Sequence, residues 1–371
     1  MYSTHTCPRC AHSISLERML GNVVVCSCGW SGNKSHFEKQ GRKLPLKKLF
    51  LTLTFIGVAY MAYDGQNWGK HYPERLWYNA LTTLKQTTAK DEARMGTVCK
   101  ELENHHCAAA AYKKAFSKAP KAYELAGALG VELSQLGESD SAILTFQNFF
   151  SHKDGNDEHM RYFARALSDK EYIDDATEWY YKSLQDNPKN FETAKEFIQH
   201  LTKNEHHAEA LSVIGHYNTL FPETRKSWAE LSQKTKDNFT AYTQKYDIQE
   251  MKIAGLNKYL HAPVRFSNSK ETQLFLVDPD SEFLSMDLVQ LKELGVAYQD
   301  LGEKEVLATN GRSVKGNQII LPELSVGPFL LKNVKAIACD NCAFLLGKEV
   351  MQSLNFKSQE SRGVRYITLK Q

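Results

Sequence analysis

A repeat of 34 residues between positions 89 and 222 most constrains the fold of this chain. Four copies align without gaps, and each aligned column keeps one kind of side chain. A period of this length predicts stacked helix pairs, because one pair cannot bury its apolar face alone. One column holds alanine, a second an aromatic residue or isoleucine, and a third Met, Leu or Phe: Ala108, Ala142, Ala176 and Ala210; Tyr112, Phe146, Tyr180 and Ile214; Met95, Leu129, Phe163 and Phe197.

The repeat resembles the tetratricopeptide repeat (TPR), which implies an all-α solenoid of four repeats over residues 89–222. Small residues at Gly96, Gly130 and Ala164 are expected to let the first helix of a pair approach the alanine of the second. Residues 223–250 are interpreted as a capping helix and a linker. Such arrays present a groove to a polypeptide or protein partner, so docking is the favoured function and a spacer is the alternative.

Residues 44–66 are interpreted as a single transmembrane helix. The segment 49–63 is uncharged but covers only about 22 Å as a helix, so the span must include flanking residues. A buried core helix is the alternative. Residues 1–48 hold eight Lys or Arg against two Glu, which predicts a cytoplasmic N-terminus. The expected location is therefore a bacterial inner membrane, with the C-terminal domains in the periplasm.

Four cysteines lie before this apolar segment, at Cys7, Cys10, Cys26 and Cys28. A Cys-x-x-Cys pair followed by a Cys-x-Cys-Gly suits one tetrahedral structural zinc ion. Residues 1–40 resemble the zinc ribbons at the N-termini of some bacterial membrane proteins. Disulfide pairing is the alternative, which a reducing cytoplasm disfavours.

Four more cysteines follow the apolar segment. Cys99 falls in a core column of the repeat, so we expect it to be buried as a small apolar side chain. Cys339 and Cys342 enclose Asp-Asn and form either a disulfide or a redox pair, of which a structural role is favoured.

Residues 271–283 contain an apolar strand that ends at Asp278 and continues as Pro279-Asp280-Ser281. This segment resembles the active-site strand of the retropepsin-like aspartic proteases, in which Asp-Thr-Gly stands at these positions. The resemblance implies an all-β retropepsin-like barrel over residues 255–371. Other segments occur in the family's order: strands at 262–266 and 272–277, a hairpin turn at Asn310-Gly311, and Phe344-Leu-Leu-Gly347, which is expected to pack behind the loop.

Aspartic proteolysis needs two adjacent carboxylates, and such a chain supplies one. An active unit would therefore be a homodimer with two copies of Asp278 as catalytic residues. Pro279 lacks the hydrogen-bond donors of the family's Thr, and Asp280 adds a negative charge that would modify the site. Three interpretations remain: an active endopeptidase, a binding fold with weakened or lost catalysis, or a turn in an unrelated β domain. The sequence favours the second.

The composition is that of a folded protein, with 42% hydrophobic residues and a formal net charge of +3. This charge predicts no nucleic-acid partner. The sequence thus predicts a multidomain envelope protein with a zinc ribbon, one transmembrane helix, a TPR solenoid and a retropepsin-like barrel.

Overall fold

The structure is a computed structural model, and it describes residues 5–6, 13–14, 19–20, 23–25, 31–33, 68–83, 87–256, 259–267, 269, 271–307, 313–361 and 364–371. The chain divides into two compact units, residues 1–76 and residues 77–371.

Five short strands and the first residues of helix α3 (Trp68–Thr83) make up the described part of the first unit, and the strands pair with one another. They form one two-stranded and one three-stranded antiparallel sheet, in the orders β1-β2 and β3-β4-β5. Their bounds are β1 His5–Thr6, β2 Ser13–Ile14, β3 Met19–Leu20, β4 Val23–Val25 and β5 Ser31–Asn33.

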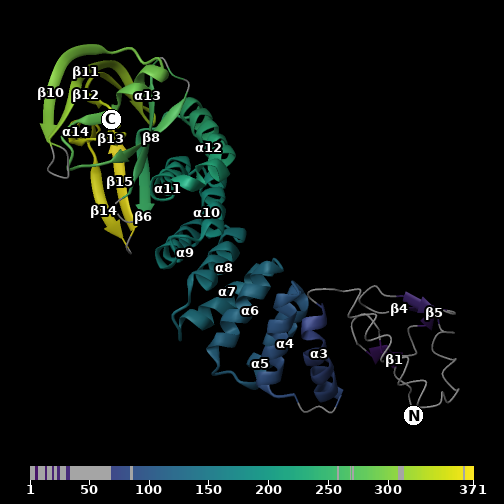
Figure 1. The fold of residues 1–371 in the computed structure, drawn as a ribbon. Coiled ribbons are helices and arrows are strands. Elements are labelled where there is room, and N and C mark those ends of the chain that lie inside the picture. Colours follow the sequence, from purple (N-terminus) through teal and green to yellow (C-terminus); the bar gives the residue numbers. More distant parts are fainter. Residues whose placement is uncertain are drawn as a thin grey trace. The chain divides into compact units, whose positions relative to one another are not determined.

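Four antiparallel helix pairs, which we call the helical array, follow helix α3 (Trp68–Thr83), and Figure 1 shows them one after another. The predicted helical solenoid is therefore confirmed. The pairs are α4 Ala89–Glu101 with α5 His105–Lys118, α6 Tyr123–Gln135 with α7 Ser139–Phe150, α8 Asp157–Asp169 with α9 Ile173–Asp186, and α10 Phe191–Lys203 with α11 His207–Leu220.

The repeated columns form the interior of the array. All four alanines of the first column are fully buried. Two of the small residues, Gly96 and Gly130, lie against the aromatic column, a contact that the expected role did not include. A Cβ atom added to Gly96 would lie 2.7 Å from the ring of Tyr112, and one added to Gly130 would lie 2.8 Å from the ring of Phe146. Each glycine therefore leaves room for an aromatic ring of the second helix.

Helix α12 (Arg225–Lys245) follows the array after a 3-10 turn, η2 (Pro222–Thr224). Pro222 suits this start because the first residue of a helical turn needs no backbone N–H. Most of α12 is exposed, but Trp228 and Phe239 are buried. These two side chains belong to the same apolar cluster as α11 and the strands that follow.

A seven-stranded sheet in the order β10-β11-β12-β9-β13-β8-β7 closes on itself, because β11 also pairs with β7. This closed sheet is the C-terminal β barrel. Its strands are β7 His261–Phe266, β8 Thr272–Val277, β9 Leu284–Asp287, β10 Gln299–Leu307, β11 Ser313–Val326, β12 Phe329–Cys339 and β13 Leu345–Leu346, with short helices α13 Leu288–Glu293 and α14 Lys348–Ser353 between strands.

A separate three-stranded sheet in the order β14-β15-β6 lies against the array. Its strands are β6 Glu250–Leu256, β14 Lys357–Ser361 and β15 Val364–Lys370. Helix α11 packs on β6, β7 and β8. Figure 1 shows α11 beside β6 and β8. One apolar cluster, which includes Leu211, Ile253 and Phe275, runs from the last repeats through this sheet into the barrel. Array and barrel therefore share a core.

Candidate functional site

The end of β8 carries Asp278, which is half-buried. The backbone N–H of Asp278 donates to the carbonyl of Leu346 in β13 at 3.1 Å. Its own carbonyl accepts the N–H of Ser281 at 3.2 Å, which closes a turn after the strand. The carboxylate of Asp278 is thus attached to the barrel through two neighbouring strands.

Within this loop, the Oδ1 atom of Asp278 accepts the backbone N–H of Asp280 at 3.0 Å. Asp280 stands where the family has Gly, yet its N–H still reaches the carboxylate. The Asp280 side chain is exposed, so the second charge lies at the surface of the loop. Pro279 between them has no N–H to donate. The loop keeps one backbone contact to the carboxylate and lacks a donor at the position of the family Thr.

Phe344-Leu-Leu-Gly347 packs behind this loop, as expected. A Cβ atom on Gly347 would lie 2.3 Å from the carbonyl oxygen of Phe283 and 2.9 Å from that of Ser281. The next residue, Lys348, donates its N–H to Ser281 at 2.8 Å. Only a residue without a side chain allows this approach of two backbone segments.

The predicted hairpin is confirmed as the antiparallel pair β10 and β11. Its expected turn at Asn310-Gly311 lies outside the described residues. Lys304 of β10 places its ammonium 4.5 Å from the ring centroid of Phe283, in the Asp278 loop. This cation–π contact connects β10 of the hairpin to the Asp278 loop.

One chain supplies one carboxylate, Asp278, at the position that the resemblance to retropepsin-like proteases assigns to catalysis. Hydrolysis by two carboxylates that share a proton would require the same loop from a second copy.

A second candidate site is an open pocket of about 440 Å³ on the first helices of repeats three and four, α8 and α10. Three cations and three carboxylates line it, with polar and aromatic side chains between them. The lining residues are Arg165, Ser168, Asp169, Tyr180, Glu192, Lys195, Glu196, Gln199, His200 and Lys203.

Glu196 is the half-buried carboxylate of this array pocket. Burial raises its pKa, against the lowering effect of nearby arginines. The Nη1 atom of Arg161 lies 3.8 Å from Oε1 of Glu196. Oε2 is buried and has no hydrogen-bond partner among the described residues. An unpaired buried acceptor is costly, so Oε2 lowers the stability of the array around it.

The four cysteines after the apolar segment form two disulfides, Cys99–Cys107 and Cys339–Cys342. Cys99 is buried as expected, but it also pairs with Cys107 across the α4–α5 turn, which the sequence reasoning missed. The signal for this disulfide in the sequence is the spacing of eight residues between Cys99 and Cys107, which places one cysteine in each helix of a pair. Cys339 and Cys342 close the connection between β12 and β13.

The cysteines predicted to bind zinc, Cys7, Cys10, Cys26 and Cys28, lie outside the described residues. The first pair falls in the connection from β1 to β2, and the second in the connection from β4 to β5. Four thiolates are a donor set that suits tetrahedral zinc.

The predicted membrane span, residues 44–66, also lies outside the described part. Among the residues that the structure does describe, no helix has both the length and the apolar character needed to cross a bilayer.

Comparisons with known proteins give partial likenesses. No model of a known protein family and no curated protein matches the sequence. Among solved structures, YrrB, described as a TPR protein with an unusual peptide-binding site, is 16% identical, with a TM-score of 0.36 over 45% of this chain and 82% of YrrB.

Two further structures are also similar to part of this chain. MamA 41-end from Desulfovibrio magneticus RS-1 is 10% identical, with a TM-score of 0.35, over 54% of this chain and 97% of its own. A retropepsin-like aspartic protease from Rickettsia conorii is 16% identical, with a TM-score of 0.25, over 32% of this chain and 92% of its own. These likenesses concern the fold alone.

Proposed function

We propose that this protein is a single-pass protein of the bacterial inner membrane that binds an extended polypeptide through its helical array. The C-terminal domain is a retropepsin-like barrel that keeps the frame of an aspartic protease with weakened or lost catalysis. The array pocket on α8 and α10 carries the proposal, because it is open and is lined by side chains of both charges.

The pocket suits a polypeptide better than a compact apolar ligand. Charged and amide side chains such as Arg165, Lys195 and Gln199 line it, and these groups can bond backbone and side-chain groups of a bound segment. Arrays of this kind commonly present such surfaces to extended partners.

Weakened catalysis follows from the Asp278 loop. Pro279 lacks the donors that would connect two such loops, and Asp280 would add a carboxylate from each copy to a dimer. Four carboxylates at one twofold axis disfavour the single-proton state that catalysis needs.

The alternative function is an active aspartic endopeptidase that works as a homodimer through Asp278. One observation favours it: the N–H of Asp280 still donates to the Asp278 carboxylate at 3.0 Å. A bond to the charged form stabilises a carboxylate in the site.

The proposed membrane topology is supported by the distribution of cysteines. Both disulfides lie after residues 44–66, where an oxidising periplasm would maintain them. The four thiols of Cys7, Cys10, Cys26 and Cys28 lie before that segment, on the side that the basic residues place in the cytoplasm. There they would hold one zinc ion, which would cross-link the two hairpins and leave no position open for catalysis.

The docking proposal is tested by probing an array of unrelated 12-residue peptides, a length chosen by us, with the full chain. Replacing Lys195 and Lys203 by Glu reverses two charges of the pocket and should abolish or redirect the bound set. The matched control replaces Lys113 and Lys114, which are exposed on α5 outside the pocket, by Glu. Equal binding by both variants and the wild type would contradict docking in this pocket.

A further inference from the structure

The contact between α11 and β7, which we call the α11–β7 joint, contains two buried histidines. His216 on α11 is 1% exposed, and His261, the first residue of β7, is 3% exposed. The backbone N–H of His261 donates to Ser212 Oγ at 3.0 Å. Nε2 of His261 lies 3.0 Å from Thr219 Oγ1. A Cβ atom on Gly215 would lie 2.3 Å from Cγ of His261, so the imidazole lies directly on the backbone of α11.

In the described part of the chain, neither ring has a hydrogen-bond acceptor at Nδ1, which a protonated imidazole would need. The Nδ1 atoms of His216 and His261 are buried and have no hydrogen-bond partner among the described residues. A protonated imidazole carries a donor on each nitrogen, so a charged ring here would leave a buried N–H unsatisfied.

The surroundings supply no compensating charge. From α11 the neighbours are Thr219 and the ring of Tyr217, and from the segment before β7 the neighbour is Tyr259, whose backbone bonds His216. On β8 the residue opposite His261 is Leu276. Among the described residues, no carboxylate contributes to the pKa of either ring. Each protonated histidine would instead repel the other.

We propose that the α11–β7 joint is an acid-sensitive coupling, which opens when His216 and His261 are protonated and frees the barrel from the helical array. Opening begins at β7, which pairs with β8, the strand that ends in Asp278. Acid would therefore detach the Asp278 side of the barrel from α11, while the array pocket on α8 and α10 stays formed.

The lowered pKa values of the two histidines determine how the stability of the joint changes with pH. Burial lowers the pKa of His216 to about 4, and burial together with the charge of His216 lowers the pKa of His261 to about 3. An exposed histidine has a pKa of about 6.5. The closed joint is thus fully stable above about pH 6.5, and its stability falls as the pH drops towards the folded values. Between pH 7.5 and pH 5 the two groups together raise the opening constant on the order of 10³-fold.

His200 in α10 offers a matched control. It is also buried, and burial lowers its pKa to about 4. Unlike His216 and His261, His200 has a hydroxyl partner at each ring nitrogen. Nδ1 lies 2.7 Å from Ser168 Oγ, and Nε2 lies 3.1 Å from Thr177 Oγ1. A protonated His200 can keep both bonds, because a hydroxyl can accept as well as donate.

The test is hydrogen exchange of the full chain between pH 7.5 and pH 4.5, corrected for intrinsic exchange rates. In the wild type, protection of residues 208–220 and 259–266 should fall on the order of 10³-fold by pH 5, while residues 105–150 remain protected. The double variant His216→Gln with His261→Gln should lose this pH dependence, and His200→Gln should behave as the wild type.

Three results would overturn the proposal: an unchanged acid midpoint in the double variant, loss of protection in residues 105–150 at the same pH, or removal of the effect by His200→Gln alone. If the double variant does not fold at pH 7.5, the single variants His216→Gln and His261→Gln test the proposal. Each should reduce the effect to roughly 30-fold, since one histidine then remains.

Discussion

Ser212 of α11 accepts the backbone N–H of His261 at 3.0 Å, and this bond connects the last helix of the array to the first strand of the barrel. The Ser212 side chain is fully buried. One apolar cluster includes side chains of both the array and the barrel, so the two parts pack against each other through a common core.

Replacement of Ser212 by Ala should destabilise this joint. It leaves the N–H of His261 buried and without a partner, which costs about 1–3 kcal/mol. Urea unfolding of the full chain measures the loss. Ser117→Ala is the control, since Ser117 is exposed and bonds only its own helix, and it should change the free energy of unfolding by less than about 0.5 kcal/mol. Equal effects of the two replacements would contradict the role given to Ser212.

Gly347→Ala should disrupt the loop that holds Asp278. Its methyl group would meet the backbone of Phe283 at 2.3 Å and 2.5 Å, and backbone atoms cannot move aside as a flexible side chain can. We expect a loss of about 3 kcal/mol or more, measured by thermal unfolding. Gly295→Asn provides the control, because Gly295 has a φ of +63° that Asn tolerates and nothing lies within 4 Å of its added Cβ. A variant Gly347→Ala as stable as the wild type would exclude the close packing described here.

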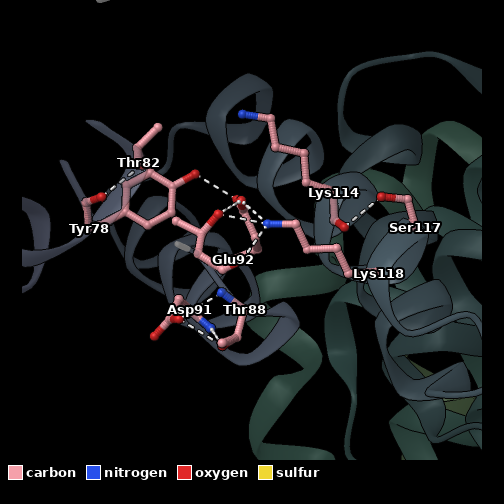
Figure 2. A network of polar contacts seen from close by, with 9 residues as sticks. Tyr78, Thr82, Thr88, Asp91, Glu92, Lys114, Ser117 and Lys118 are labelled. Atoms are coloured by element: carbon pink, nitrogen blue, oxygen red, sulfur yellow. Dashed lines mark hydrogen bonds and ion pairs between the residues drawn. The ribbon is translucent and has the colours of Figure 1, made fainter. Parts of the chain in front are cut away.

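Glu92 connects α3 to the first repeat, as Figure 2 shows. Its carboxylate is buried and accepts the hydroxyls of Tyr78 at 2.6 Å and Thr87 at 2.9 Å and the ammonium of Lys118 at 2.8 Å. Burial raises the pKa of Glu92, but these three bonds together lower it below its ordinary value. Burial and the bond to Glu92 raise the pKa of Tyr78 to about 12.

Replacement of Glu92 by Gln should therefore move the ionisation of Tyr78 back towards pH 10, since one source of the shift is removed. Ultraviolet titration of tyrosinate in the full chain, with Tyr78→Phe to assign the signal, checks the direction. The same replacement should cost about 1–3 kcal/mol of stability in the first repeat. An unchanged Tyr78 titration would show that Glu92 does not bond this hydroxyl.

Thiol counting tests the cysteine assignments. With zinc bound and the disulfides intact, the native full chain should react with no maleimide. A chelator should expose the four thiols of Cys7, Cys10, Cys26 and Cys28, because metal-free thiolates are reactive. Reduction should then expose Cys99, Cys107, Cys339 and Cys342. Peptide mapping identifies the labelled residues, and release of the first four by reductant alone would favour disulfides in place of zinc.

The helical part of the fold was predictable because a 34-residue period repeats the same packing four times. Even there, the contact of Gly96 with the ring of Tyr112 was not predicted, since only the alanine column was expected to lie near the small residues. The Cys99–Cys107 disulfide was not predicted, because the position of Cys99 in a core column of the repeat already accounted for its burial.

In the barrel, the strands around Asp278 and the role of Gly347 followed from a resemblance in residue order. The contact from the Asp280 N–H to Asp278 did not, because a side chain at the glycine position does not reveal where its backbone N–H points. Nothing in the sequence distinguished His216 and His261, which become neighbours only when α11 packs on β7. Sites made by such long-range packing have no local signature.

Direct comparison of binding and cleavage in one sample tests the central claim most directly. The full chain and its Asp278→Asn variant are incubated with the same peptide library from pH 4 to pH 7, a range chosen by us, and bound and cleaved peptides are identified by mass spectrometry. The account predicts that both proteins retain the same peptides, and that the wild type leaves nearly all of them uncleaved. Cleavage of most bound peptides by the wild type, lost in Asp278→Asn, would contradict the account and favour the active endopeptidase.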